Sequence, residues 1–235
     1  MSKIETVLGP IEPDKLGVTM THEHSLIDMT SWFRMPTEAS RKWIAKAKVE
    51  IGILGDLRRD PSTCLDNMIL DDLDLMTKEI SAYKDAGGST LVTCSVDGLG
   101  RDPVRLRTLS IRTGVNILVP TGFYVQNSHP DHVKNMNSEQ LSDLMVKELT
   151  EGIDNTGIKA GLMGEVGCGE PVPWHPEEKK VVEAAAKTQS IVGCALTIHP
   201  ALIDSKTKKP VKTAEVYVDT LEQGNANLEK FYLSH

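Results

Sequence analysis

Short apolar runs rich in β-branched residues alternate along this chain with longer segments whose apolar residues recur every three or four positions. The first pattern predicts buried strands, and the second predicts amphipathic helices. The expected strands cover residues 17–24, 89–96, 116–124, 158–166, 193–199 and 230–235. The expected helices run over about 70–87, 103–114 and 137–149, from 176 onward, and over about 213–224. Residues 29–61 follow neither period clearly.

Capping residues support several of these helices. Asp102-Pro103 has the chemistry of an N-cap followed by a first helical residue. Asn137 is followed three positions later by Gln140, which predicts a capping box. The pair Gly87-Gly88 is typical of a helix end.

The alternation of strand and helix predicts a parallel α/β fold, either a doubly wound sheet or a (β/α)8 barrel of the TIM type. No glycine-rich phosphate loop follows any expected strand, which weakens the dinucleotide-binding form of the doubly wound sheet. The candidate chemistry favours the barrel, because it falls at or near the C-terminal ends of strands, the catalytic face of barrel enzymes. The residues concerned are His22, His24, Glu165, His199 and His235. We expect a single barrel domain over residues 1–235.

Composition narrows the class of protein. The chain has 235 residues, 40% hydrophobic and 25% charged, as is usual for a globular protein. A net charge of −7 argues against a nucleic-acid partner or an anionic membrane. No apolar run is long enough to span a bilayer, no signal peptide is visible, and the four cysteines lack C-x-x-C spacing. We expect a cytoplasmic protein that binds a small molecule, and we leave open whether it forms a homo-oligomer.

The first expected strand leads into the most informative motif, Thr21-His-Glu-His24. In a strand, the spacing i, i+2 points both imidazoles to the same face. Two convergent neutral imidazoles are a usual beginning of a divalent transition-metal site. A chance pair among seven histidines is the alternative, so the motif depends on the other polar residues.

An ordered set of motifs along the whole chain resembles the phosphotriesterase family of the amidohydrolase superfamily, in particular its phosphotriesterase-related branch. The motifs are Leu8-Gly-Pro-Ile, Leu16-Gly-Val-Thr-Met-Thr-His-Glu-His, Gly122-Phe-Tyr-Val, Gly161-Leu-Met-Gly-Glu-Val-Gly, Thr197-Ile-His-Pro and Leu233-Ser-His. The resemblance implies a (β/α)8 barrel that holds two divalent metal ions, with Zn²⁺ expected first and Mn²⁺ or Fe²⁺ as alternatives.

The resemblance also implies a ligand set. His22 and His24 would bind one ion, His199 and His235 would bind the other, and Glu165 would bridge them as a catalytic residue. Bacterial phosphotriesterases bridge with a carboxylated lysine, whose ungapped position is occupied here by Gly164. A glutamate bridge is the pattern of the phosphotriesterase-related branch.

The activity implied is hydrolysis of an amide or ester bond in a small molecule, such as an N-acyl amino acid or an N-acyl taurine, by a hydroxide shared between the metals. Two alternatives stay open. One is a metal-dependent deoxyribonuclease of the TatD type, against which the acidic balance counts. The other is a catalytically inactive scaffold.

Tyr124 and His129 are expected to contact substrate, although the polar loops around His129, His132 and His175 also favour solvated surface positions. The family continues through two further strands, the last of which supplies an aspartate ligand. We therefore expect this chain to be a C-terminally truncated version of the barrel, with about six of its βα units.

Overall fold

The computed structural model describes residues 3–169, 174–201 and 214–234. Its main strands form two parallel sheets whose members follow one another in chain order. The first sheet consists of β3 (Thr19–Glu23), β6 (Thr90–Thr93) and β7 (Asn116–Leu118). The second consists of β8 (Pro120–Thr121), β9 (Leu162–Gly167), β10 (Leu196–His199) and β11 (Phe231–Leu233). All neighbours are parallel, which confirms the expected α/β class.

Only Val119 separates β7 from β8, so the two sheets form one continuous series of six strand positions. The order is that of six successive strands of a TIM-type barrel. Among the described residues, β3 and β11 do not pair with each other, so the barrel is not closed there. In the described part of the chain, the Tyr232 hydroxyl of β11 donates to the Thr21 carbonyl of β3 at 3.1 Å, across the two edges.

Each expected strand is present but shorter than predicted. The largest difference is the expected strand 116–124, which divides at Val119 and ends at Thr121. Pro120 has no amide hydrogen, so it interrupts the ladder that a continuous strand would need. Beyond it, Phe123 lies outside any strand and makes an isolated bridge with Asp97.

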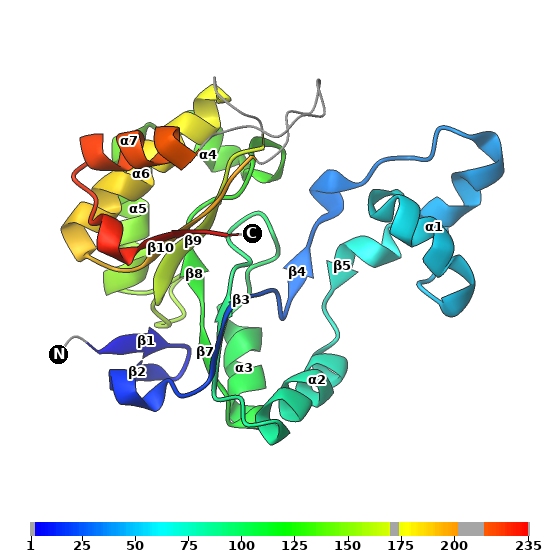
Figure 1. The fold of residues 1–235 in the computed structure, drawn as a ribbon, viewed down its shortest axis with the longest axis horizontal. Coiled ribbons are helices and arrows are strands. Elements are labelled where there is room, and N and C mark those ends of the chain that lie inside the picture. The colour runs from blue at the N-terminus through cyan, green and yellow to red at the C-terminus, as the bar shows by residue number, and fades with distance from the viewer. Residues whose placement is uncertain (1–2, 170–173, 202–213, 235) are drawn as a thin grey trace.

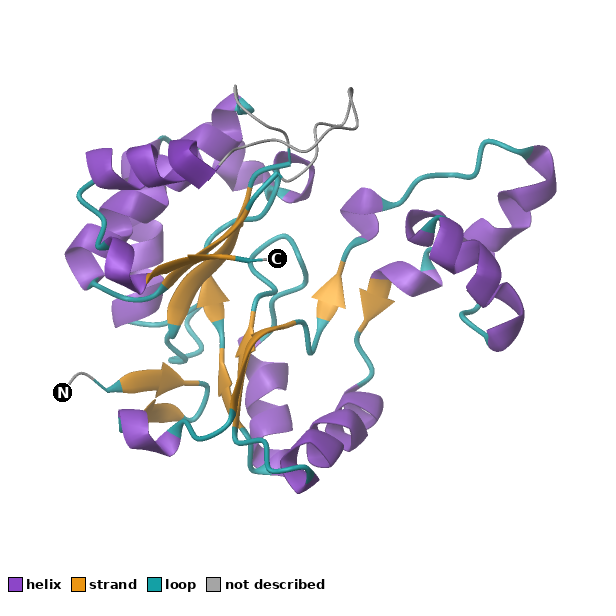
Figure 2. Ribbon diagram, viewed as in Figure 1, coloured by secondary structure: helices purple, strands orange, loops and turns teal. Residues whose placement is uncertain are grey.

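Helices lie on the outside of the strand series (Figures 1 and 2). They are α2 (Leu73–Asp85), α3 (Pro103–Thr113), α4 (Asp131–Asn135), α5 (Ser138–Thr150), α6 (Pro176–Val192) and α7 (Ala214–Gln223). The predicted caps are present, since Asp102 accepts from the Arg105 amide and Asn137 with Gln140 forms a capping box. The short α4 was not expected. No helix in the described part of the chain is long and apolar enough to cross a bilayer.

Two kinds of packing hold the strands in place. The main core joins the strands to the inner faces of α5 and α6, where residues 184–186 are three buried alanines that allow close approach. A buried ion pair adds to it, with both terminal guanidinium nitrogens of Arg101 donating to Glu148 at 2.6 and 2.8 Å. Glu148 also accepts from the Thr121 hydroxyl, so α5 is tied to β8.

A hairpin lies at the other end of the strands. It consists of β1 (Ile4–Thr6) and β2 (Gly9–Ile11), and the Val7 amide donates to the Ile117 carbonyl of β7 at 2.9 Å. It therefore covers the region away from the strand ends that carry the histidines.

Residues 29–68 form a lobe that projects from the strands (Figure 1). Its base is the antiparallel pair β4 (Ile27–Asp28) and β5 (Ile69–Leu70), and its one α-helix is α1 (Leu54–Arg59). The rest is short 3₁₀ helix and loop around a small core of Ile44, Ile53, Leu57 and Cys64. Short 3₁₀ segments carry no 3.6-residue period, which is why this region gave no clear pattern.

Candidate metal centre

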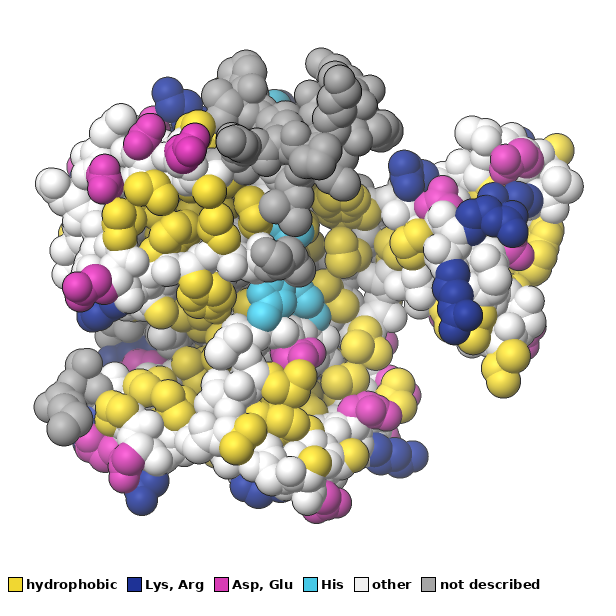
Figure 3. All heavy atoms as spheres, in the orientation of Figure 1, with side chains coloured by type: hydrophobic (Ala, Val, Ile, Leu, Met, Phe, Trp, Pro, Cys, Tyr) yellow, Lys and Arg dark blue, Asp and Glu magenta, His cyan; other side chains and the backbone are white. Residues whose placement is uncertain are grey.

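Four of the expected site residues stand at or near the C-terminal ends of three strands. His22 lies in β3 and His24 directly follows it, Glu165 lies in β9, and His199 ends β10. β3 and β9 are not neighbours in the strand order, but the curvature of a barrel turns side chains from both towards a common centre. Histidine side chains are visible near the middle of the face drawn in Figure 3.

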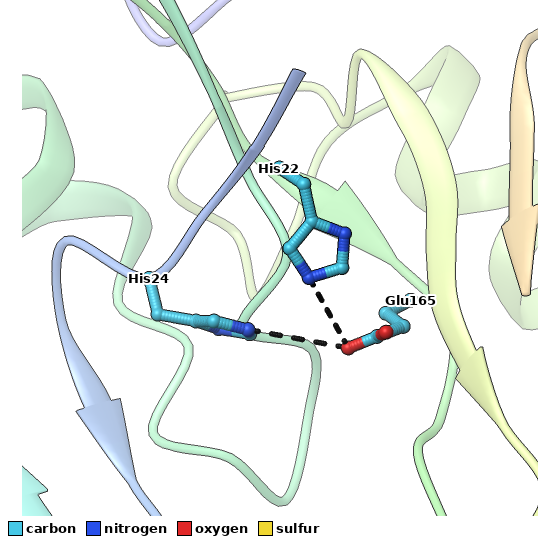
Figure 4. Close-up of side chains that lie close together, drawn as sticks. All are labelled: His22, His24 and Glu165. Carbon is cyan, nitrogen blue, oxygen red and sulfur yellow. Dashed lines mark ion pairs between the residues drawn. The ribbon is translucent and has the colours of Figure 1, made fainter. Parts of the chain in front are cut away.

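The two carboxylate oxygens of Glu165 face different histidines. Oε2 lies 3.6 Å from Nε2 of His22 and 4.0 Å from Nε2 of His24. Oε1 lies 2.7 Å from Nδ1 of His199. Figure 4 shows His22 and His24 approaching the carboxylate from the same side. The carboxylate thus stands between a pair of imidazoles and a third one.

The donor set on the Oε2 side fits a divalent transition metal. One ligand atom each from His22, His24 and Glu165 lie within 4.8 Å of one another. Ligand atoms about 2.1 Å from a tetrahedral zinc ion lie about 3.4 Å apart, which is only slightly closer than the 3.6 and 4.0 Å measured here. Imidazole nitrogen and carboxylate oxygen are also the donor types that suit Zn²⁺, Mn²⁺ and Fe²⁺. The ligand roles themselves stay a prediction.

The neighbouring histidines favour the ionised form of Glu165. Burial raises the pKa of the Glu165 carboxyl, but the hydrogen bond and charge of His199, together with the charges of His22 and His24, outweigh burial. The resulting pKa lies below the ordinary value. The side chain is therefore an anion at neutral pH although it is almost completely buried.

The backbone before Glu165 explains why the chain has no lysine at position 164. Gly164 has φ of +109°, and a Cβ atom there would come within 2.2 Å of the Thr197 carbonyl oxygen. Any larger residue would therefore collide with β10. The carboxylate for this site comes from the next residue instead.

Tyr124 contacts the far side of His199. Its hydroxyl lies 3.2 Å from His199 Nε2, and the two rings are edge to face with centroids 5.0 Å apart. Burial, and then the charge of Glu165, raise the pKa of the Tyr124 phenol. The hydroxyl therefore stays protonated at neutral pH. The Tyr124 ring also lies 6.4 Å from the ring of Trp32, at the root of the projecting lobe.

The surface position expected for His129 is wrong, because its side chain is only 2% exposed. Nε2 lies 2.7 Å from the Tyr124 carbonyl oxygen, to which it donates, and Nδ1 lies 3.3 Å from Glu177. His129 thus holds the backbone of Tyr124. His132 and His175 are exposed as expected, and His175 caps the start of α6. The sequence around His129 is that of an ordinary polar loop, so it gave no sign that His129 is buried while His132 and His175 are exposed.

One contact was missed entirely. The hydroxyl of Ser95, in the segment after β6, lies 3.0 Å from Nδ1 of His24. Its only signal in the sequence is its place just beyond an apolar run, where barrel residues face the catalytic end.

His235, an expected ligand, lies outside the described residues.

These observations define a (β/α)8-type barrel protein with a candidate metal centre at the C-terminal ends of its strands. A comparison with protein-family models makes the class more specific. The phosphotriesterase family model matches residues 2–230, and the chain belongs to that family.

Individual relatives agree with this assignment. An N-acetyltaurine hydrolase from Salmo salar is 34% identical over 99% of this chain and 64% of its own length. A phosphotriesterase-related protein from Nematostella vectensis is 34% identical over 98% of this chain and 64% of its own length. The crystal structure of a resiniferatoxin-binding protein from Rhodobacter sphaeroides matches with a TM-score of 0.93 at 35% identity, over 99% of this chain and 63% of that one. The chain thus spans 64% of the length of these curated relatives.

Proposed function

We propose that this chain carries the centre of a binuclear metal-dependent hydrolase of the phosphotriesterase-related type. The observation that carries the proposal is that the two carboxylate oxygens of Glu165 face different histidines. One oxygen faces His22 and His24, and the other faces His199. If two divalent ions were bound, His22 and His24 would offer nitrogen donors to one and His199 would offer a donor to the other, with the Glu165 carboxylate between them.

Two bound divalent ions would make a hydroxide nucleophile from water at neutral pH and polarise the bond to be cleaved. The residues of the chain supply the rest. Glu165 remains ionised and offsets the positive charge of the centre. Tyr124 holds the ring of His199 on one side and keeps its own proton, so it can donate a hydrogen bond to a substrate oxygen. His129 supports Tyr124 through the backbone carbonyl of that residue.

For the substrate we propose an amide or ester bond in a small molecule, with N-acyl taurines and N-acyl amino acids as the first class. The name of the Salmo salar relative, an N-acetyltaurine hydrolase, supports this class. The Tyr124 ring contacts His199 and lies 6.4 Å from the tilted ring of Trp32, so an acyl group bound beside His199 could pack against these rings. Zn²⁺ is the metal we would supply first.

The test combines metal analysis with turnover. Purified protein is expected to contain about two ions per chain and to hydrolyse members of a panel of N-acyl taurines, N-acyl amino acids, lactones and phosphotriesters. A protein that binds no divalent metal and turns over none of the panel would contradict the proposal and support the scaffold alternative. Hydrolysis of DNA would support the deoxyribonuclease alternative, which neither the family match nor the net charge of −7 favours.

A further inference from the structure

Ser95 contacts the ring nitrogen of His24 that does not face Glu165. Its Oγ lies 3.0 Å from His24 Nδ1 and 2.6 Å from the Leu26 carbonyl oxygen. Ser95 is 2% exposed and follows β6, which pairs with β3. One buried hydroxyl therefore joins the end of β6 to both sides of the turn that follows β3.

These two contacts determine which nitrogen of His24 carries a hydrogen. A hydroxyl has a single proton, and a carbonyl oxygen can only accept. Two oxygens 2.6 Å apart need a proton between them, so Ser95 donates to Leu26. The hydroxyl can then only accept from His24, whose Nδ1 must be the protonated nitrogen. The lone pair of the neutral ring is left on Nε2, the nitrogen that faces Glu165.

We infer that Ser95 is a positioning residue that holds His24 as the Nδ1–H tautomer, which leaves the Nε2 lone pair facing Oε2 of Glu165, where it would bind a metal ion. This inference rests on the proposed metal-binding function of His24. Metal-binding histidines usually donate the N–H of their second ring nitrogen to an acceptor, and loss of that acceptor commonly weakens metal binding by about 10–100-fold. Here the acceptor is a serine hydroxyl made acceptor-only by a backbone carbonyl.

Thr93 offers a matched control on the same segment. It is also buried, and its hydroxyl donates to the Leu118 carbonyl in β7 at 2.8 Å. Thr93→Val removes a buried hydroxyl close to Ser95 in the chain but leaves the contact with His24 in place. Ser95→Thr retains a hydroxyl and serves as the rescue variant.

The experiment uses the full chain stripped of metal. Zinc is titrated in competition with a chelator, and the ¹⁵N shifts of the histidine rings are recorded without metal to read the tautomer of His24. Ser95→Ala is expected to weaken zinc binding on the Oε2 side of Glu165 by about 10–100-fold and to lower the Nδ1–H population of His24. Thr93→Val is expected to leave both readouts unchanged, and Ser95→Thr to restore them.

The inference is overturned if wild-type His24 is the Nε2–H tautomer, or if Ser95→Ala binds zinc as tightly as wild type. It is also overturned if Ser95→Ala and Thr93→Val weaken zinc equally, since the effect would then be general loss of packing. Failure of the proposed function looks different, because the wild type itself would bind no zinc. In that case the tautomer measurement still decides whether Ser95 orients the ring.

Discussion

The two sides of Glu165 hold their histidines in different ways. On the Oε2 side, two imidazoles come from one strand end at 3.6 and 4.0 Å, and a buried serine orients one of them. On the Oε1 side, His199 makes a direct 2.7 Å contact and is oriented by Tyr124, from a different strand end. The pairing of His22 with His24 follows from local spacing along the chain, whereas the contact of His199 with Tyr124 depends on two distant segments meeting. We therefore expect the two sides to respond separately to substitution.

The largest effect should come from the residue that both sides share. Glu165→Gln keeps the size of the side chain but removes the charge that offsets two dications, so bound metal should fall from about two ions per chain to near zero. Elemental analysis of the purified variant measures this. Glu178→Gln is the matched control, because Glu178 is also buried but accepts from the Gln126 and Gly169 backbone amides. Full metal content in Glu165→Gln would show that Glu165 does not bridge.

Removal of one histidine should separate the two sides. His24→Ala should lose the ion on the Oε2 side, and His199→Ala the ion on the Oε1 side, so each variant should retain about one ion per chain. Cobalt substitution distinguishes the two single-ion forms by their visible spectra. If both variants lost both ions, the sides would be one cooperative unit and the comparison would not hold.

A smaller effect on metal binding is expected from removal of the Tyr124 hydroxyl, which contacts His199. Tyr124→Phe removes the partner of Nε2 and should weaken the Oε1-side ion by about tenfold, while the other ion is unaffected. Zinc titration measures both. Tyr83→Phe is the control, since the Tyr83 hydroxyl donates to the backbone carbonyls of Val18 and Thr90. Equal zinc affinities in Tyr124→Phe and wild type would limit Tyr124 to packing or to substrate contact.

The smallest effect concerns the metal-free protein. The folded-state pKa of Glu165 lies below its ordinary value, so the carboxylate stabilises the fold above the unfolded pKa of about 4.3. That contribution is lost as the pH falls through the folded pKa. The stability of wild type relative to Glu165→Gln should therefore decrease as the pH is lowered from about 6 to about 3, as followed by urea unfolding. A relative stability that rises on acidification would contradict this sign.

Much of the barrel could be predicted from the sequence, because its elements depend on local chemistry. Periodicity and capping residues identified α2, α3 and α5 close to their observed ends. The spacing of His22 and His24 predicted imidazoles on one face, and both Nε2 atoms do face Glu165. The lobe at 29–68 could not be predicted in the same way, since 3₁₀ turns around a small core leave no regular period.

Other features were decided only by the tertiary structure. Nothing near His129 in the sequence shows that a loop folds back and buries it against Tyr124 and Glu177. Ser95 and His24 are separated by 71 positions, and only the pairing of β3 with β6 brings them into contact. The sequence by itself determined which residues could serve as donors. The barrel decided which atoms of those residues face one another, because hydrogen-bond and ligand geometry depend on distances of a few tenths of an ångström between distant strands.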